Sequence, residues 1–534
     1  MNPPDLDPTQ PGLLSRTLRI GHKPLGFKVA RSAVSSVLRK VIVAPISLLL
    51  VPFTLYKVGV AGYGTWAILS TIINLTWIMD PGLGPTVTKY VAEHSGTNDV
   101  SEIRRVLDAS CAICLFMSAI ASCLVWFCSH AIIRELFRGP AAPPTSEILS
   151  LWPLVMLCIV AFLMTTPFLA FINGRQRMDL TNALILAAEL FSALATVVFL
   201  LAGAKVRGLL FAQLLTSLFI LVGSLVIGRR LLPSVIPNPF RCKLTTLRKI
   251  VMFSVPLYAG YIMTSLQGQL ERLYLARFVG VVSVGWYSVA GQGAVKVKRG
   301  PDMLLGPVLA AASELDASKE RHKLEELHFR AHKYLALTAV PLAVFAVVTA
   351  KTLMRVWVGS GLEMVAFTFA LLVIGNFAAQ MGAPTYFIMV GRGILRPAVY
   401  GSLLAIVLNV VLSYIFIKRW GFSGAALGTA LPMIISGIYF FIACKPHFEA
   451  PLYQTLRRAY LKPLLCSVAA VSVVPVVSLL NLRIWYGLLL EMVAFGTVYL
   501  IGLAVTRFFD SFDFAKAENH LPFLRLTRRI IPVS

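Results

Sequence analysis

Three cationic side chains lie within four residues of one another in an otherwise apolar stretch: Lys296, Lys298 and Arg299. A cation at the centre of a bilayer costs about 2.5–3.5 kcal/mol, so such a cluster is tolerated only beside water, protein or a counter-charge. Helical spacing places Gln292, Lys296 and Arg299 on one stripe, whereas Lys298 points elsewhere and can pair with Asp302. Because Arg binds phosphate bidentately and Lys binds it as a point charge, the stripe predicts a site for an anionic solute.

The preceding apolar stretch carries further polar residues. Gln269 and Arg272 share one helical face, and we expect them to extend the anion site. The alternative is a structural role, in which the cations pair with carboxylates such as Asp302, Glu189 or Glu271. If the cations line a binding cavity, they should lack carboxylate partners. If their role is structural, each should be paired with a carboxylate.

The string Asp-x-x-Leu-Gly-Pro occurs twice, beginning at Asp80 and at Asp302. Each copy places a carboxylate and a helix-breaking Gly-Pro near the middle of a long apolar stretch, where such groups are costly. Asp80 either caps the second part of a broken helix or takes part in ion coupling or gating, because a desolvated carboxyl can exchange protons. Asp302 has the same two interpretations, and Glu189 is a third candidate proton site. The expected gating residues also include three prolines: Pro81, Pro85 and Pro307.

The chain as a whole is apolar and basic. Of its 534 residues, 57% are hydrophobic and only 14% are charged, which predicts an all-α protein that crosses a membrane many times. Lys and Arg number 49 against 24 Asp and Glu, but they lie between apolar segments rather than on one soluble surface. We therefore expect no binding of nucleic acid.

No pattern indicates a cofactor or a metal. Gly291 and Gly293 fall in a predicted membrane helix rather than after a strand, which excludes a dinucleotide fingerprint. His328 and His332 could share a metal with Glu325, but at the charged start of a helix we expect solvated side chains. The eight cysteines indicate packing rather than a disulfide framework.

A bilayer is spanned by about 20 apolar residues, and the sequence contains fourteen such stretches. They lie near residues 33–56, 63–93, 104–129, 148–173, 180–203, 207–229, 249–278, 283–314, 332–350, 364–390, 395–417, 422–444, 460–480 and 485–507.

Positive charge predicts the orientation of these segments. Most Lys and Arg lie in the N-terminal tail, the even-numbered connections and the C-terminal tail, so both termini are expected in the cytoplasm. The longest outward connection, near residues 130–147, leaves no room for an outward domain. We expect neither a soluble enzyme domain nor enzymatic activity.

The two Asp motifs belong to a longer internal repeat. The Leu-Arg-Lys at residues 38–40 recurs at 247–249, and a Gly-x4-Gly motif recurs at Gly59 and Gly280, within offsets of 209 to 222 residues. Six segments separate each pair, so both halves enter the membrane in the same direction. The predicted regions are a cytoplasmic tail, a six-helix N-lobe, a six-helix C-lobe, and two extra helices with a basic tail, over residues 1–32, 33–245, 246–450 and 451–534.

Three blocks of sequence resemble a known family. Residues 62–70 (Gly-Tyr-Gly-Thr-Trp-Ala-Ile-Leu-Ser), residues 80–93 (Asp-Pro-Gly-Leu-Gly-Pro-Thr-Val-Thr-Lys-Tyr-Val-Ala-Glu) and residues 284–290 are similar to patterns in bacterial polysaccharide-type flippases. These O-antigen and lipid-linked oligosaccharide flippases belong to the multidrug/oligosaccharidyl-lipid/polysaccharide (MOP) exporter superfamily. The resemblance covers roughly residues 30–450. It departs from the family at Pro81, where relatives often have Leu.

The resemblance implies two six-helix lobes around a central cavity that opens alternately to either side of the bacterial inner membrane. It implies export of a polyprenyl-pyrophosphate-linked oligosaccharide, with membrane lipids, H+ or Na+ as a coupling ion, and polysaccharide assembly proteins as further partners. The pyrophosphate would then bind Lys296, Arg299 and Arg272.

Three other functions remain open at this point. A drug/cation antiporter and a peptidoglycan-precursor flippase belong to the same superfamily, and the antiporter should carry fewer buried cations. A membrane-embedded glycan polymerase or ligase belongs to a different class, and it would normally have a large outward loop.

Overall fold

The computed structural model describes residues 25–80, 82–97, 99–233, 237–254, 269–359, 363–448, 452–480, 483–510 and 513. For residues 25–34, 37, 310 and 452 it describes the backbone alone. Over these ranges all regular structure is helical. Pro81 lies outside the described residues, as do residues 255–268 of the segment expected at 249–278 and most of the C-terminal tail.

The first half of the chain forms α1 (Leu25–Leu75), η2 (Thr76–Met79), α2 (Leu83–Gly96), α3 (Val100–Phe127), α4 (Ser129–Leu136), α5 (Thr145–Gly174), α6 (Met178–Leu201), α7 (Lys205–Leu231) and η3 (Pro239–Arg241). Residues 244–254 are also helical. The second half forms α9 (Leu270–Phe278), α10 (Val281–Asp302), α11 (Gly306–Ala317), α12 (Arg321–Val348), α13 (Ala350–Val358), α14 (Glu363–Met381), α15 (Ala383–Gly391), α16 (Arg396–Cys444) and η4 (Lys445–His447). The chain continues with α17 (Leu452–Val471), α18 (Val473–Ser478) and α19 (Ile484–Val505).

Ten helical stretches within the described residues are long and apolar enough to cross a bilayer. The longest two, Leu38–Met79 and Arg396–His447, each include residues from two of the segments expected from sequence. Each is broken at a glycine with positive φ, Gly59 at 70° and Gly421 at 57°, a conformation that glycine adopts without steric cost. An all-α, multi-pass membrane protein is therefore confirmed, whereas the number of fourteen crossings stays a prediction.

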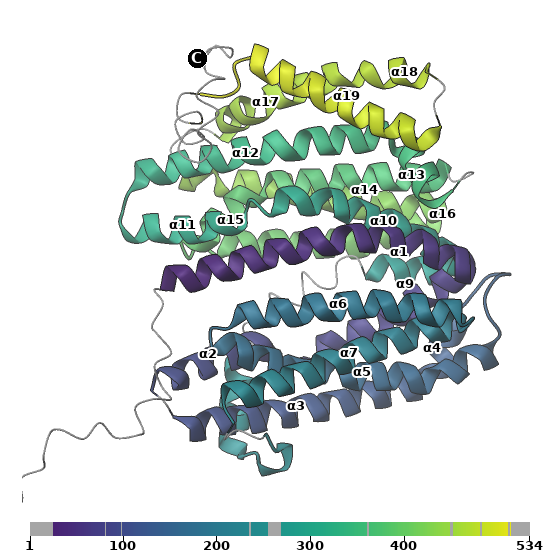
Figure 1. The fold of residues 1–534 in the computed structure, drawn as a ribbon, viewed down its shortest axis with the longest axis vertical. Helices are drawn as coiled ribbons and strands as arrows, with labels where there is room; N and C mark the ends of the chain where they lie inside the picture. Colours follow the sequence, from purple (N-terminus) through teal and green to yellow (C-terminus); the bar gives the residue numbers. More distant parts are fainter. Residues whose placement is uncertain are drawn as a thin grey trace, which may run out of the picture.

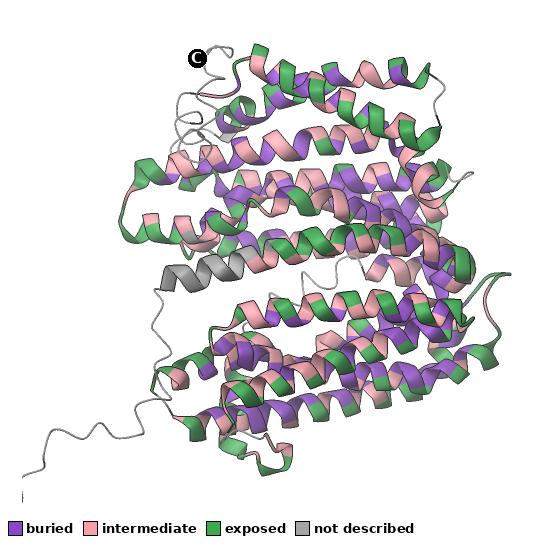
Figure 2. Cartoon of the chain, viewed as in Figure 1, coloured by how far each residue is buried: buried purple, intermediate pink, exposed green. Residues whose placement is uncertain are grey.

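The helices lie roughly parallel in one slab, and segments from the two halves occupy opposite ends of it (Figure 1). Helices α2–α7 pack on one another, and α9–α16 form the neighbouring group, with α17–α19 beyond them. Helix α1 contacts α6 and α7 on one side and α10 on the other. Exposed residues cover much of the outer faces, and buried ones concentrate where helices meet (Figure 2).

Helices α1 and α10 approach each other at backbone distance. A Cβ placed on Gly64 would lie 2.0 Å from the Val281 carbonyl oxygen, and one on Gly285 would lie 2.7 Å from the Val60 carbonyl oxygen. The largest apolar cluster also combines residues of the first half, such as Trp152 of α5, with residues of the second half. The contact therefore requires glycine at both positions, and it places the face of α10 that carries Gln292 against α1.

Residues just beyond the predicted N-lobe pack on the first half. The Ser254 hydroxyl donates to Thr86 Oγ1 of α2 at 2.8 Å, and the Phe253 ring centroid lies 5.6 Å from that of Tyr90. The lobe boundary at residues 245/246 stays a prediction.

Candidate functional site

The three cations of α10 lie in its last two turns, in different surroundings. The Lys296 Nζ is buried and has no hydrogen-bond partner among the described residues; it lies 5.6 Å from the ring centroid of Trp357 on α13. The Lys298 Nζ lies 3.8 Å from a carboxylate oxygen of Asp302, as the four-residue spacing predicted. The Arg299 side chain is exposed. Lys296 is therefore the cation whose charge is least compensated.

The other polar residues of the predicted anion site lie nearby. Gln292 donates from Nε2 to the hydroxyl of Tyr63 on α1, which is 2% exposed. The charge of Arg272 on α9 acts on the same hydroxyl. The Arg272 Nε and the Gln269 Oε1 are buried, and neither has a hydrogen-bond partner in the described part of the chain. The structure thus brings Gln292 and Arg272 together around Tyr63.

Glu189 of α6 faces the other end of this row. Its carboxylate is acted on by the charges of Arg39 on α1 and Arg299 on α10. The Glu189 Oε2 is buried without a hydrogen-bond partner among the residues described. One cation of each half is therefore within electrostatic range of this carboxylate, and no ion pair of Lys296, one turn from Arg299, occurs within the described residues.

The two Asp motifs both lie at helix breaks, but their carboxylates accept hydrogen bonds from different kinds of donor. Asp80 is 5% exposed, and its Oδ1 accepts a hydrogen bond from the backbone N–H of Leu83 at 2.8 Å, at the start of α2. Asp302 ends α10, and its Oδ1 accepts from Gln380 Nε2 of α14 at 2.7 Å. Pro85 lies in the first turn of α2 and Pro307 in that of α11, and both are exposed. Their gating roles stay predictions.

Residues 29–301, half of the chain, match a family described as "Polysaccharide biosynthesis protein". The chain belongs to this family. A candidate O-antigen transporter of Shigella flexneri is 19% identical over 385 residues, which cover 71% of this chain and 89% of that protein. The resemblance read from the sequence motifs is therefore confirmed.

Solved structures share the fold of this family member. A lipid II flippase, MurJ in an inward closed conformation, superposes with a TM-score of 0.63 at 14% identity and covers 90% of this chain and 98% of its own. An inward-facing multidrug transporter of the MOP superfamily gives a TM-score of 0.60 at 15% identity, covering 80% and 99%. At such identities the likeness establishes the fold, which is that of MOP transporters.

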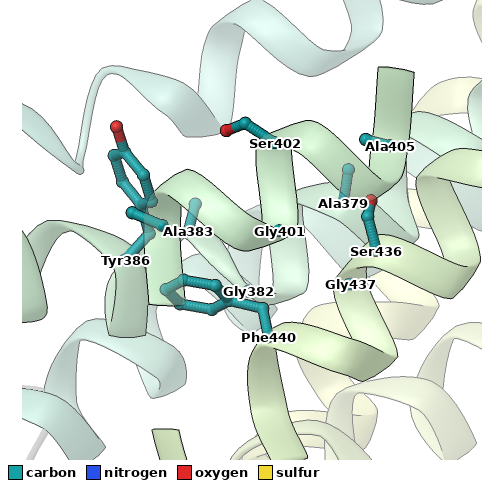
Figure 3. A pocket seen from close by; sticks show the side chains of 11 residues that line it. Ala379, Gly382, Ala383, Tyr386, Gly401, Ser402, Ala405, Ser436, Gly437 and Phe440 are labelled. Atoms are coloured by element: carbon teal, nitrogen blue, oxygen red, sulfur yellow. The ribbon is translucent and has the colours of Figure 1, made fainter. Parts of the chain in front are cut away.

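A cavity of about 210 Å³ lies between α14, α15 and α16, and no cation of α10 lines it (Figure 3). Small residues such as Gly382 and Gly401 line it, with the Phe440 ring below and the Tyr386 and Ser402 hydroxyls at its rim. It contains no charged side chain, so this cavity is unsuited to an anionic solute.

Sequence reasoning missed the surroundings of Glu271 on α9. This carboxylate is 0% exposed, and its Oε1 accepts from Asn409 Nδ2 at 2.6 Å and from the Thr429 hydroxyl at 3.2 Å, both on α16. Three buried oxygens around it lack hydrogen-bond partners within the described ranges: Glu271 Oε2, Asn409 Oδ1 and Ser413 Oγ. The two halves of α16 meet here because a Cβ on Gly428 would lie 2.6 Å from Ser413 Cα. The spacing of Gly424 and Gly428, small residues four positions apart in an apolar stretch, was the available signal for a close helix contact.

The expectation that His328 and His332 are solvated is wrong. They are 1% and 0% exposed, and both imidazoles contact the Thr385 hydroxyl of α15, at 2.9 and 3.0 Å. The Tyr460 hydroxyl lies 3.2 Å from His332 Nδ1. Helix α17, which packs on α12, covers a surface that the local sequence presents as polar. No cluster of three or more His, Cys, Asp or Glu suited to a metal occurs in the described ranges.

A second cationic cluster, also missed, ties α12 to the chain beyond α19. Arg330 Nη1 lies 2.7 Å from Asp510 and 3.1 Å from Asp513, and Lys333 Nζ lies 3.1 Å from Asp510 and 2.5 Å from Asp513. Burial opposes ionisation of Asp510, but hydrogen bonds from the Asp513 backbone and from Lys333 outweigh it and lower the pKa of Asp510 to about 2. Every charge in this cluster is compensated.

Proposed function

We propose that this chain is a flippase that moves a polyprenyl-pyrophosphate-linked oligosaccharide across the bacterial inner membrane. Membership of the polysaccharide biosynthesis family and the fold of MOP transporters support export of a polysaccharide precursor. The similarity to a candidate O-antigen transporter points to the same substrate class.

The observation that carries the proposal is the uncompensated charge of Lys296. A buried ammonium without a hydrogen-bond partner is costly, so its retention favours a role in binding an anionic ligand. Arg299 lies one turn away and is exposed, although its charge acts on Glu189 in the opposite half. An exposed group between two packed halves is expected in a water-filled space, which a pyrophosphate could enter.

In this proposal the substrate divides into three parts. The pyrophosphate binds Lys296, Arg299 and Arg272, while Lys298 remains with Asp302. The glycan occupies the hydrated space between residues 33–245 and 246–450, which act as two lobes. The polyprenyl chain stays in the surrounding lipid.

The test uses the full chain reconstituted in vesicles that contain a short polyprenyl-pyrophosphate-linked oligosaccharide in the inner leaflet. Exposure of the glycan outside is followed with a glycan-cleaving enzyme added externally. We expect cleavage in vesicles with the chain and background cleavage in vesicles with the Lys296→Ala, Arg299→Ala variant. Equal cleavage by both would overturn the assignment of the site.

Parallel assays separate the competing functions. Extrusion of a cationic dye with no glycan transfer would indicate an antiporter, and transfer of a peptidoglycan precursor alone would indicate the other flippase class. Longer glycan chains formed from the supplied units would indicate a polymerase. Any of these three outcomes would contradict the proposal.

We also propose that Glu271, rather than Asp80, binds the coupling cation. The carboxylate is fully buried, and neutral oxygens of Asn409 and Ser413 without partners lie on the facing helix. One carboxylate with neutral oxygen donors is a ligand set that suits a hard cation such as Na+ or a proton. Asp80 Oδ1 instead accepts the backbone N–H of Leu83 at the start of α2.

The Glu271→Gln variant tests this assignment because it keeps the volume and removes the charge. We expect glycan transfer to lose its dependence on a Na+ or H+ gradient while substrate binding persists. If the gradient still drives transfer in this variant, and Asp80→Asn removes the dependence instead, Glu271 is not the coupling site.

A further inference from the structure

A basic cavity of about 650 Å³ lies between α12, α17 and the end of α19, and no residue of α10 lines it. These three helices lie side by side at one end of the slab (Figure 1). Four cations of the cavity wall come from α17 and the chain after α19: Arg457, Arg458, Lys462 and Arg507. Lys333 and Asp510 form its inner wall.

The acid of this cavity does not neutralise those four cations. Asp510 is engaged by Arg330 and Lys333, which hold it at 2.7 and 3.1 Å. No ion pair of Arg457, Arg458 or Arg507 occurs within the described residues, and all three side chains are exposed. The outer wall therefore carries a net positive charge that is open to a ligand.

The cavity also lies at a membrane boundary. The spans Tyr453–Ser478 and Ile484–Val505 begin and end beside it, so its cations stand at the ends of apolar helices. Exposed apolar side chains continue from it towards the centre of the helices, with Leu461 at 41%, Leu465 at 57% and Val505 at 74% exposure. Tyr453, at the first turn of α17, is 69% exposed, in the position that interfacial aromatics prefer.

We propose that this cavity binds the headgroup of an anionic phospholipid of the surrounding bilayer. The phosphate lies against Arg457, Arg458 and Arg507, and the acyl chains follow the apolar surface of α17 and α19. Guanidinium groups bind phosphate oxygens bidentately, and basic pockets between membrane helices suit such headgroups. A soluble phosphate compound would not contact the adjoining apolar surface. A basic cavity next to an exposed apolar surface therefore favours a lipid.

The experiment measures lipid binding to the purified full chain by native mass spectrometry. Phosphatidylglycerol and phosphatidylcholine are titrated in parallel, because they differ in headgroup charge. We expect phosphatidylglycerol to bind more tightly, and the Arg457→Gln, Arg458→Gln variant to lose about 30-fold in its affinity, since each interfacial charge contributes about 1 kcal/mol. The Arg457→Lys, Arg458→Lys variant should retain most of the preference.

The matched control is Arg229→Gln, Arg230→Gln, a pair of neighbouring exposed arginines in the last turn of α7. This control should bind phosphatidylglycerol as the unaltered chain does. Equal loss in the control and the α17 variant would show unspecific attraction to basic residues and overturn the proposal. Displacement of the lipid by millimolar inorganic phosphate or glycerol phosphate would identify a soluble ligand instead. Binding of the lipid does not depend on the transported substrate, so this result and that of the glycan assay can fail separately.

Discussion

Two groups of cations in the second half of the protein differ in how their charge is compensated. On α12, Arg330 and Lys333 share Asp510 and Asp513, and the Lys333 side chain is only 4% exposed. On α10, the Lys296 Nζ is buried without a hydrogen-bond partner in the described part of the chain. Each group lies on a helix of the second half, and only the group on α12 has carboxylates of another segment against both of its cations.

This difference in charge compensation indicates a structural role for the α12 cluster and a binding role for Lys296. In the compensated cluster the cations are ion-paired with carboxylates of the chain. The cluster therefore holds α12 against the segment after α19 and leaves no unpaired charge for a ligand. An uncompensated cation raises the free energy of the resting protein, and such a cost is usually found at binding sites. The comparison predicts that substitutions in the first cluster affect stability and that those in the second affect transport.

The largest effect is expected for Lys296→Ala combined with Arg299→Ala. Glycan export should fall to background, since both proposed phosphate ligands are lost. The thermal denaturation midpoint in detergent should stay the same or rise, because a buried unpaired ammonium has been removed. Export is measured as surface glycan in cells that lack their own flippase.

The control for this double variant is Lys298→Ala, which removes a cation from the same turn. Its side chain is 35% exposed and paired with Asp302, so export should be reduced only modestly. Were Lys298→Ala as defective as the double variant, the distinction between paired and unpaired cations on α10 would be lost.

Asp513→Asn should have the second-largest effect, this time on stability. The substitution leaves Lys333 buried with half of its compensation, and breaking a buried pair costs about 3–5 kcal/mol, less here because Asp510 remains. We expect a lower denaturation midpoint in detergent. Export per folded molecule should be unchanged, and a selective loss of export at normal stability would reverse the roles assigned to the two clusters.

Sequence alone predicted the helices and the cations of α10, but not the α12 cluster. Apolar length and glycine positions are local properties, which is why the breaks near Gly59 and Gly421 fall between expected segments. Pairing is a property of packing. His328, His332 and Lys333 look like a solvated helix start until α17 and the end of α19 cover them. Glu271 was noticed as an acid, yet its partners Asn409 and Thr429 are about 140 and 160 residues away.

Asp80 tests whether a single buried carboxylate is structural or functional. The expected effects are smaller than those for the two cation clusters. Asn caps helices about as well as Asp, whereas Ala costs about 0.5–2 kcal/mol. Asp80→Asn should therefore keep both stability and export, and Asp80→Ala should lower the denaturation midpoint. Loss of export in a stable Asp80→Asn protein would instead identify this carboxyl as a proton-exchanging group.

The smallest effect is expected from acid on the α12 cluster. The folded-state pKa of Asp510, about 2, lies below its ordinary value of 3.8, so its contribution to stability is complete above pH 4 and is lost as the pH falls towards 2. Because the side chain is 32% exposed, screening limits this contribution to about 1 kcal/mol. Denaturation midpoints between pH 7 and pH 3 should fall more steeply for the unaltered chain than for Asp510→Asn.

Lys296 has no acid partner to protonate, so the Lys296→Ala variant should follow the unaltered chain over this range. A flattened profile in Lys296→Ala would mean that the two clusters share a titrating group, and the separation between them would not hold.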